Sequence, residues 1–290
     1  MPDLKKLVGF FLIVLSMLGL TVNLVVLFPL IRLARRPGKT SIHVIALTTV
    51  INDLISSMLN TFYLAPTIIL SNPLFGDSID DPIPTFISQF FMLMWYMQNF
   101  QMILMALNRL FAITLRKPSF FSKSRIVSFF AFAGAYSVIK TCLNIWVMPC
   151  CLVLYNHENF GYTFFNDTTT NYADISDYPL FAICFTVTIV SYITIFITIH
   201  KSNKTIEHCV TSSQYRHLRA HEVSYAVQFA AVSLFGMLSF ATFRIFHEFL
   251  QDQCTICFAV VPVFHTISIS ANALIYLCWN WEVQANLQGG

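Results

Sequence analysis

Charged residues are scarce in this chain of 290 residues. Asp, Glu, Lys and Arg together make up 11% of it, whereas 56% of the residues are hydrophobic and 15% are aromatic, with 29 phenylalanines. The mean hydropathy of +0.66 is higher than a soluble fold of this length can accommodate in its core. A soluble globular protein is therefore excluded, and the composition indicates a protein that lies in a lipid bilayer.

Short segments of alternating polarity are also lacking, which excludes a membrane β-barrel with strands of about 9–11 residues. The apolar runs are instead long enough for helices of about 20 residues that cross the hydrocarbon core. We predict an all-α membrane protein with one domain over residues 1–290, a seven-transmembrane helix bundle. The segment after Cys278 predicts one or two amphipathic turns beneath the membrane. The predicted spans are residues 7–31, 41–70, 83–110, 126–155, 178–200, 221–246 and 254–278.

Lysine and arginine are missing from every second loop between these spans, where acids occur instead: Asp77, Asp80, Asp81, Glu158, Asp167, Asp174, Asp177 and Asp252. The other loops are basic and contain Arg32, Arg35, Arg36, Lys39, Arg116, Lys117, Lys123, Arg125, Lys201, Lys204, Arg216 and Arg219. Because basic loops stay in the cytoplasm, we predict an extracellular N-terminus and a cytoplasmic C-terminus. Lys5 and Lys6 argue weakly for the opposite. The net charge of +3 then reflects an inner face near anionic lipid, and no nucleic-acid partner is expected.

Cysteines and glycosylation motifs fit this orientation. Asn166 begins an Asn-Asp-Thr sequon in a predicted outer loop, whereas Asn203 begins one on the predicted inner side, so only Asn166 is a glycosylation candidate. The outer cysteines either pair in disulfides or stay as buried free thiols; they are Cys150, Cys151, Cys254 and Cys257. No second ligand pair of suitable spacing accompanies the last two, so no metal site is expected.

Four different short motifs lie in order along the chain, one in each of four predicted spans. They are Gly19-Leu-Thr-Val-Asn23, Asn52-Asp53-Leu54, Asn108-Arg109-Leu110 and Asn272-Ala-Leu-Ile-Tyr276. Together they resemble a rhodopsin-like G-protein-coupled receptor. Within that superfamily, three features are similar to the nematode serpentine chemoreceptors, class x: the sequence Asn-Arg-Leu-Phe-Ala-Ile after the third span, the short ends, and Glu222 with Gln228 at the start of the sixth span. The resemblance implies that Asn108, Arg109 and Tyr276 take part in switching and in coupling to a heterotrimeric G protein.

The chain lacks several features usual in that superfamily. Asn108 replaces the acid that precedes the third-span arginine, so the charge that would restrain Arg109 is missing. No proline occurs in the sixth span, and Ala273 replaces the proline after Asn272. No cysteine lies between Asp77 and Phe91, so the bridge from the third span to the next outer loop cannot form.

A carboxylate within the second span needs a proton, water or a cation, because an unpaired charge is costly at that depth. Asp53 is that carboxylate, and it has four polar residues at similar depth: Asn23, Gln98, Ser268 and Asn272. The group resembles the internal sodium site of the receptor superfamily. The alternative is a structural hydrogen-bond cluster that joins the spans. In either case it is a candidate two-state element.

The third span has no acid where amine receptors show one. Phe91 stands there, eighteen residues before Arg109, which disfavours a biogenic amine, and the seventh span has no lysine for retinal. Candidate ligand-pocket residues are Phe91, Trp95, Phe243 and Arg244. For any single aromatic residue, ordinary helix packing is the favoured interpretation. Arg244 either pairs with an acidic outer loop, extends to the membrane surface, or receives an anionic ligand. Lys140, within the fourth span, is expected to face the bundle, and the sequence offers no partner for it.

Membrane enzymes and transporters typically concentrate acids or histidines at depth or contain inverted repeats. Here Asp53 is the only acid well inside the predicted spans, the eight histidines do not cluster, and the two halves show no evident repeat. We predict a chemosensory receptor of the plasma membrane that binds an extracellular small molecule or peptide, activates a G protein, has no enzyme activity and needs no cofactor. The alternatives are a ligand-gated seven-span ion channel or a transporter. The channel alternative requires an N-terminus inside, against the basic loops.

Overall fold

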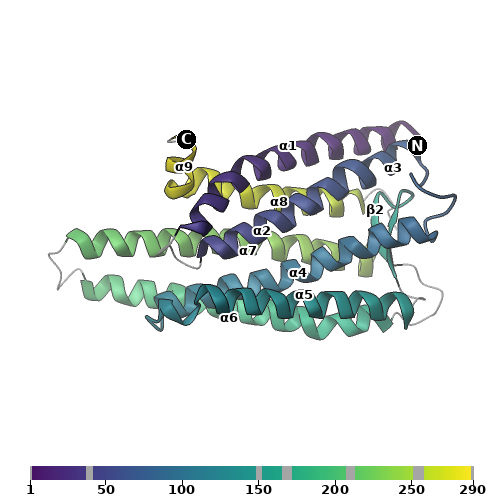
Figure 1. Ribbon diagram of the computed structural model, residues 1–290. Coiled ribbons are helices and arrows are strands. Elements are labelled where there is room, and N and C mark those ends of the chain that lie inside the picture. The colour runs from purple at the N-terminus through teal and green to yellow at the C-terminus, as the bar shows by residue number, and fades with distance from the viewer. Residues whose placement is uncertain are drawn as a thin grey trace.

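The computed structural model describes residues 2–36, 42–147, 152–164, 172–206, 213–250 and 258–288, and most of them are helical. Figure 1 shows the long helices lying side by side. In chain order the elements are α1 (Pro2–Arg35), α2 (Ile42–Leu59), η1 (Asn60–Leu64), α3 (Ala65–Leu70), α4 (Pro82–Ile113), η2 (Pro118–Phe120), α5 (Lys123–Trp146), β1 (Val153–Asn156), β2 (Gly161–Phe164), α6 (Tyr172–Ile206), α7 (Ser213–Leu250), α8 (Val260–Trp279) and α9 (Trp281–Gln288).

Within the described residues, seven helical segments are long and apolar enough to cross a membrane: Asp3–Arg35, Ile42–Leu70, Pro82–Ile113, Lys123–Trp146, Ile175–Lys201, Val223–Phe243 and Val260–Trp279. Large apolar side chains point away from the bundle, among them Leu7, Phe28 and Phe196, which are 66%, 60% and 72% exposed. So much exposed apolar surface is expected only where lipid covers it. The predicted seven-helix membrane bundle is therefore confirmed.

The fourth span ends earlier than the sequence predicts. We expected it to continue to residue 155, but α5 ends at Trp146, and Val153 already belongs to strand β1. The residues beyond the helix are apolar as well, since Val153, Leu154 and Tyr155 pack inside the protein and are each less than 7% exposed. Hydropathy alone does not distinguish a strand buried in protein from a helix in lipid.

The second span contains a wide turn. Residues Asn60–Leu64 form the π-helical turn η1 between α2 and α3, and Pro66 lies in the first turn of α3. Proline has no N–H to donate and its ring crowds the preceding turn, which accounts for the irregular hydrogen bonding just before it. The turn includes Asn60, whose side chain is only 1% exposed and is important for the site described below.

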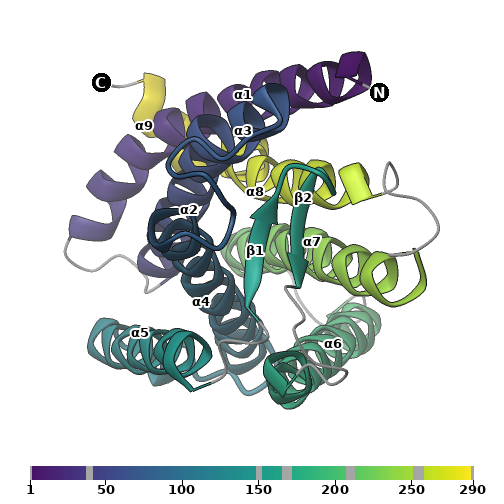
Figure 2. The ribbon, with the colours of Figure 1, turned by 90° about the vertical axis from the view of Figure 1, so that its right-hand side faces the viewer.

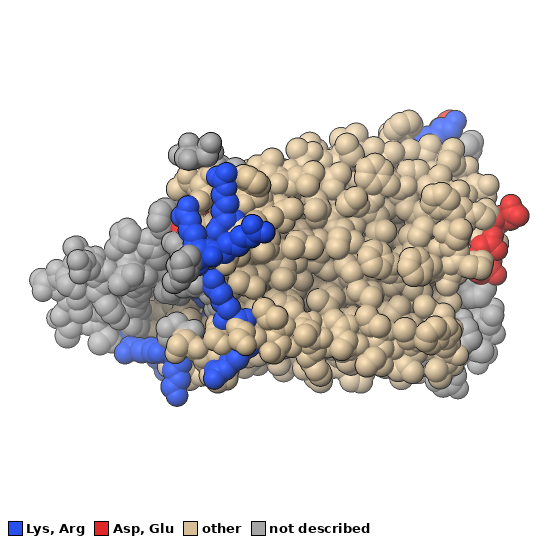
Figure 3. All heavy atoms as spheres, in the orientation of Figure 1, with Lys and Arg blue, Asp and Glu red and all other residues tan. Residues whose placement is uncertain are grey.

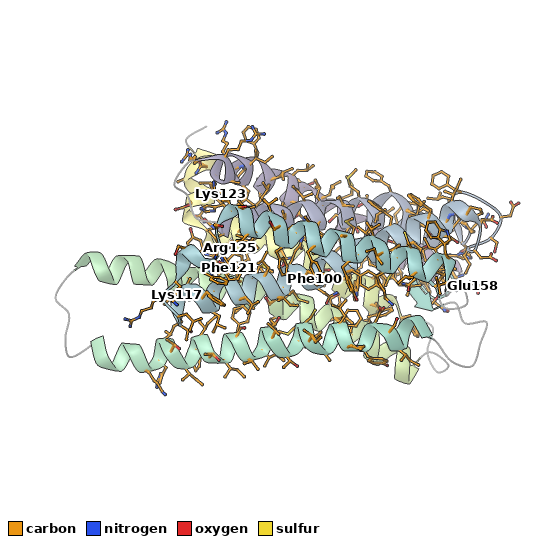
Figure 4. All side chains as sticks on the ribbon, turned by 60° about the horizontal axis from the view of Figure 1, so that its bottom comes forward. Phe100, Lys117, Phe121, Lys123, Arg125 and Glu158 are labelled. Carbon is orange, nitrogen blue, oxygen red and sulfur yellow. The ribbon has the colours of Figure 1, made fainter. Side chains whose placement is uncertain are left out.

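The two ends of the bundle differ in charge. Most lysine and arginine side chains in view gather at the end where α9 lies, whereas most acidic side chains in view gather at the opposite end, where one basic group also lies (Figure 3). Figure 4 shows Lys117, Lys123 and Arg125 toward the first end and Glu158 at the second. We call these the basic end and the hairpin end, because β1 and β2 lie at the second.

The hairpin lies across its end of the bundle, close to α4, α7 and α8 (Figure 2). Its strands are antiparallel, with Tyr155 opposite Tyr162. Strand β1 is fastened to α4 by two hydrogen bonds. The Gln89 side chain donates to the Val153 carbonyl oxygen at 3.1 Å, and the backbone N–H of Tyr155 donates to Ser88 Oγ at 3.1 Å.

At the basic end, the predicted amphipathic turns form helix α9. Asn280 caps it, since its side-chain oxygen accepts the backbone N–H groups of Glu282 at 3.1 Å and Val283 at 3.2 Å, the usual pattern at a helix start. Glu282 Oε2 lies 2.9 Å from His43 Nε2 of α2, and Val283 is fully buried. These contacts hold α9 across the end of the bundle.

Candidate functional site

The polar residues around Asp53 form the first of three groups inside the bundle. Asp53 is fully buried, and Asn272 of α8 donates its side-chain N–H to Asp53 Oδ2 at 2.7 Å. Asn23 of α1 donates to the carbonyl oxygens of Gly19 at 2.9 Å and Ile269 at 3.3 Å. Asn23 therefore joins the first span to the seventh, and the bond between Asp53 and Asn272 joins the second span to the seventh.

Several buried oxygens in and around this group have no hydrogen-bond partner among the described residues. They are Asn23 Oδ1, Asp53 Oδ1, Ser57 Oγ, Ser268 Oγ and Asn272 Oδ1. Gln98 is half-buried and no hydrogen bond in this part of the chain joins it to Asp53. Because buried oxygens are normally satisfied, this set fits a small cation or water. The donor set contains one carboxylate, which suits a monovalent ion better than a divalent one.

Gly19 explains how α1 comes so close to α8. A Cβ atom at this position would lie 2.2 Å from Ser270 Oγ. A side chain here would therefore require Ser270 to shift, and glycine lets the two helices approach enough for Asn23 to reach the Ile269 backbone. Gly19 and Asn23, one helical turn apart in α1, thus both contribute to the contact between α1 and α8.

The second group lies toward the basic end, around Arg109. This side chain is only 4% exposed, and its Nε–H donates to Asn108 Oδ1 at 3.2 Å. Its guanidinium carbon lies 5.8 Å from the ring centre of Phe229 and 6.0 Å from that of Tyr225, both on α7. The expected loss of an acidic restraint is thus partly offset, since the amide of Asn108 takes the acceptor role without the charge.

Phe229 also contacts Tyr276, whose ring centre lies 6.2 Å away in an edge-on arrangement. Phe229 and Tyr276 are each 1% exposed. One aromatic ring of the sixth span therefore contacts both the third-span arginine and the seventh-span tyrosine. In this conformation the interior between these helices is filled at the basic end.

The third group is an aromatic pocket at the hairpin end. Its cavity has a volume of about 10 Å³, and it is lined by Phe91, Met92, Trp95, Val153, Tyr162, Asp177, Phe181, Phe240 and Phe243. That volume admits about one water molecule. Three of the four predicted pocket residues, Phe91, Trp95 and Phe243, do line it. Arg244 follows Phe243 in α7, but its side chain lies outside the described part of the structure.

A buried ion pair adjoins this pocket. Lys140 Nζ of α5 lies 3.1 Å from Asp177 Oδ1 of α6, and the Tyr96 hydroxyl of α4 donates to the same carboxylate at 3.1–3.2 Å. Asn144 donates to the Tyr96 hydroxyl at 3.2 Å, and Lys140 also donates to Ser176 Oγ. The partner that the sequence did not offer for Lys140 is therefore Asp177.

This finding corrects the assignment of Asp177 to an outer loop. The residue lies in α6 and is 3% exposed, so Asp53 is not the only acid buried in the bundle. The apolar stretch that marks the fifth span begins after Asp177, and hydropathy therefore placed this acid outside. A lysine within an apolar span was the available signal, because such a charge requires an opposite charge nearby.

The site residues that the sequence did not suggest are Tyr162, Asn60 and Phe229. Tyr162 comes from a predicted loop, and Asn60 and Phe229 are ordinary residues of apolar helices. Asn166 and the four outer cysteines named above lie outside the described residues. The cysteines that the structure describes, Cys142, Cys184 and Cys278, are free thiols.

Two comparisons bear on what this arrangement is. The family model of the serpentine seven-transmembrane G-protein-coupled chemoreceptors named Srx matches residues 13–280. The chain belongs to this family. No curated protein matches the sequence. The structure is similar to the crystal structure of squid rhodopsin, with a TM-score of 0.80 and 15% identity over 100% of this chain and 85% of that one.

The prediction of a G-protein-coupled chemosensory receptor, and of its class, is thereby confirmed. The likeness to squid rhodopsin, at that identity, confirms the fold. Srx proteins form a receptor family and not an enzyme family. This Srx receptor is a multi-pass membrane protein, with a polar cluster, an arginine group and an aromatic pocket arranged along its bundle.

Proposed function

We propose that this Srx receptor lies in the plasma membrane with its hairpin end and N-terminus outside and its basic end in the cytoplasm. Positive side chains near a membrane favour the cytoplasmic side, where the leaflet is anionic. Lys117, Lys123 and Arg125 lie at the basic end, and Glu158 lies at the other (Figure 4). The proposal makes the aromatic pocket accessible from outside and the Arg109 group accessible to a G protein.

The extracellular ligand binds in the aromatic pocket, at Phe91, Trp95 and Phe243. Pockets of this kind combine apolar walls with a few polar groups that orient the ligand, and Asp177 is the charged group in the described lining. The hairpin covers the pocket, which favours a small molecule over a long peptide. Arg244 remains the residue proposed to receive an anionic group of the ligand.

The G protein binds at the basic end after α7 has moved outward. The observation that carries this proposal is the position of Phe229, in contact with both Arg109 and Tyr276. Movement of α7 takes Phe229 out of that interior and frees Asn108, Arg109 and Tyr276 to contact the partner. The cation–π contact that is lost amounts to about 0.5–2 kcal/mol, small enough for ligand and G protein to offset.

The polar cluster of Asn23, Asp53, Ser268 and Asn272 is the proposed two-state element between the two ends. If sodium binds there, the unpartnered oxygens supply its ligands, and the ion supplies the positive charge that balances Asp53. If the cluster is structural, water satisfies the same oxygens. Gln98 is the member of the predicted set whose participation requires a rearrangement. Thermal unfolding in sodium and in N-methylglucamine buffers, for the native chain and Asp53→Asn, distinguishes a sodium site from a structural cluster.

Guanine-nucleotide exchange tests the coupling. Membranes that contain the receptor should catalyse nucleotide exchange on at least one G protein of a panel, and Arg109→Glu should abolish this activity at equal surface expression. The matched control is Arg32→Gln, which removes a positive charge from α1, where the guanidinium stacks on Phe28 at 4.4 Å. Equal loss of exchange in both variants would contradict a specific role of Arg109. Exchange at background level in a folded native receptor would contradict coupling.

A further inference from the structure

The aromatic pocket is filled by a side chain of the hairpin itself. Tyr162 of β2 is 3% exposed, and its ring stacks on Phe91 of α4 with the ring centres 4.0 Å apart and the planes 14° from parallel. His265 of α8 meets the Tyr162 ring edge-on at 6.0 Å, and Tyr155 packs beside it at 4.7 Å. The ring is thus held on several sides, as a bound aromatic ligand would be.

The hydroxyl group of Tyr162 is held as specifically as its ring. It donates a hydrogen bond of 2.6 Å to Asn60 Oδ1, in the π-helical turn of the second span. Asn60 Nδ2 donates to Thr266 Oγ1 of α8 at 3.2 Å, so the side-chain oxygen of Asn60 is the atom that faces the phenol. A buried acceptor of this kind discriminates strongly between a ring that has a donor and one that does not.

Any ligand of this pocket has to replace a side chain, because the remaining cavity of about 10 Å³ is too small for an organic molecule. Most lining residues belong to membrane-spanning helices and cannot leave without disrupting the bundle. Tyr162 belongs to the hairpin. The two hydrogen bonds that fasten the hairpin to α4 are made by Val153 and Tyr155 of β1, whereas β2 is joined to β1 and lies against α8 through Gly161 and Pro262.

From these contacts we propose that the pocket is a binding site for small phenols, in which the ring stacks on Phe91 and the hydroxyl donates to Asn60, and that Tyr162 occupies this site as a tethered substitute. This inference rests on the proposed ligand pocket and names the class of ligand that it accepts. A tethered ring competes at an effective concentration in the millimolar range. Free phenols therefore bind weakly to the native chain and more tightly once Tyr162 is removed.

Thermal unfolding of the purified full-length receptor, with and without p-cresol, tests the proposal. Tyr162→Ala should unfold at a lower temperature than the native chain, and p-cresol should raise that temperature saturably, by about 3 °C or more at ten times its dissociation constant. The apparent affinity for p-cresol should be at least about tenfold higher than that of the native chain. Toluene, which has the ring without the donor, should give a smaller rise.

Two further variants make the result specific. Asn60→Leu combined with Tyr162→Ala should abolish the preference for p-cresol over toluene. Phe196→Ala, at a lipid-facing position that is 72% exposed, measures the effect of p-cresol on the lipid or detergent and should show no saturable rise. If Tyr162→Ala yields no folded protein, Tyr162→Val keeps a residue suited to a strand, and p-cresol should then increase the folded yield of either variant.

The proposal is overturned if p-cresol neither raises the unfolding temperature nor increases the yield, or if toluene is as effective as p-cresol in Tyr162→Ala. The readout requires no G protein. A positive thermal shift without nucleotide exchange would therefore support the phenol site and contradict coupling. Nucleotide exchange without a thermal shift would support coupling and contradict the phenol site.

Discussion

Phe229 and Asn108 both contribute to how firmly Arg109 is held in this conformation. The ring of Phe229 lies 5.8 Å from the guanidinium carbon, and the amide oxygen of Asn108 accepts the Nε–H group. A carboxylate would add the attraction of an opposite charge to the hydrogen bond, whereas the neutral amide of Asn108 supplies the hydrogen bond alone. Arg109 is therefore held less tightly by its neighbour than a carboxylate would hold it, and Phe229 contributes a larger share of the restraint.

Phe229→Leu tests this division. Leucine keeps most of the volume and loses the aromatic face, so about 1 kcal/mol of cation–π interaction disappears and basal nucleotide exchange should rise about fivefold. Leu234→Ala, on the same helix at a position that is 52% exposed, is the control and should leave exchange unchanged. Basal exchange that stays equal in Phe229→Leu and the native chain would show that Phe229 does not restrain the arginine.

The ion pair of Lys140 and Asp177 predicts an asymmetric mutational result. Lys140→Met leaves a buried carboxylate without its cation and should lower the free energy of unfolding by about 3–5 kcal/mol. Lys140→Met combined with Asp177→Leu removes both charges and should recover most of that loss. Thermal unfolding of the purified receptor measures both, and an equal loss in the single and double variants would contradict the pairing.

At the scale of elements, long apolar runs predicted the helices well. A segment in lipid has no water to bond, so its backbone N–H and C=O groups must bond to each other, as they do in a helix. The hairpin was not predictable in the same way. Val153, Leu154 and Tyr155 continue the apolar run of the fourth span, and their strand conformation depends on burial against α4 and β2. Phe91, Trp95 and Phe243 were predicted as pocket residues because they lie in the predicted helices. Tyr162, which fills the pocket, lies in a strand far from them in the sequence, so no local pattern placed it there.

The contact between α1 and α8 depends on one glycine. Gly19→Leu should lower the free energy of unfolding by about 1–3 kcal/mol, because its side chain overlaps Ser270 and forces the helices apart. Gly134→Ala in α5 is the matched control, since nothing lies within 4 Å of the added Cβ atom, and it should be neutral or stabilising by up to about 1 kcal/mol. Thermal unfolding that ranks the two variants in the opposite order would contradict the packing.

At the scale of the whole molecule, the distribution of charge predicts an orientation that glycan mapping can test. Asn166 and Asn203 each begin a sequon on opposite sides of the bundle in the proposed topology. Treatment of the expressed receptor with a peptide N-glycosidase should increase its mobility on a gel. Asn166→Gln should abolish that shift, and Asn203→Gln should leave it intact. A shift that depends on Asn203 alone would mean that the basic end faces outside.

In the proposed mechanism, α7 closes the basic end and moves outward when a G protein binds. The most direct measurement is the distance between labels attached through non-natural amino acids at Leu115 beyond α4 and Val227 on α7, which are 49% and 50% exposed. This distance should increase when a nucleotide-free G protein is added, and the increase should be lost in Arg109→Glu. An unchanged distance in a receptor that catalyses nucleotide exchange would contradict this mechanism.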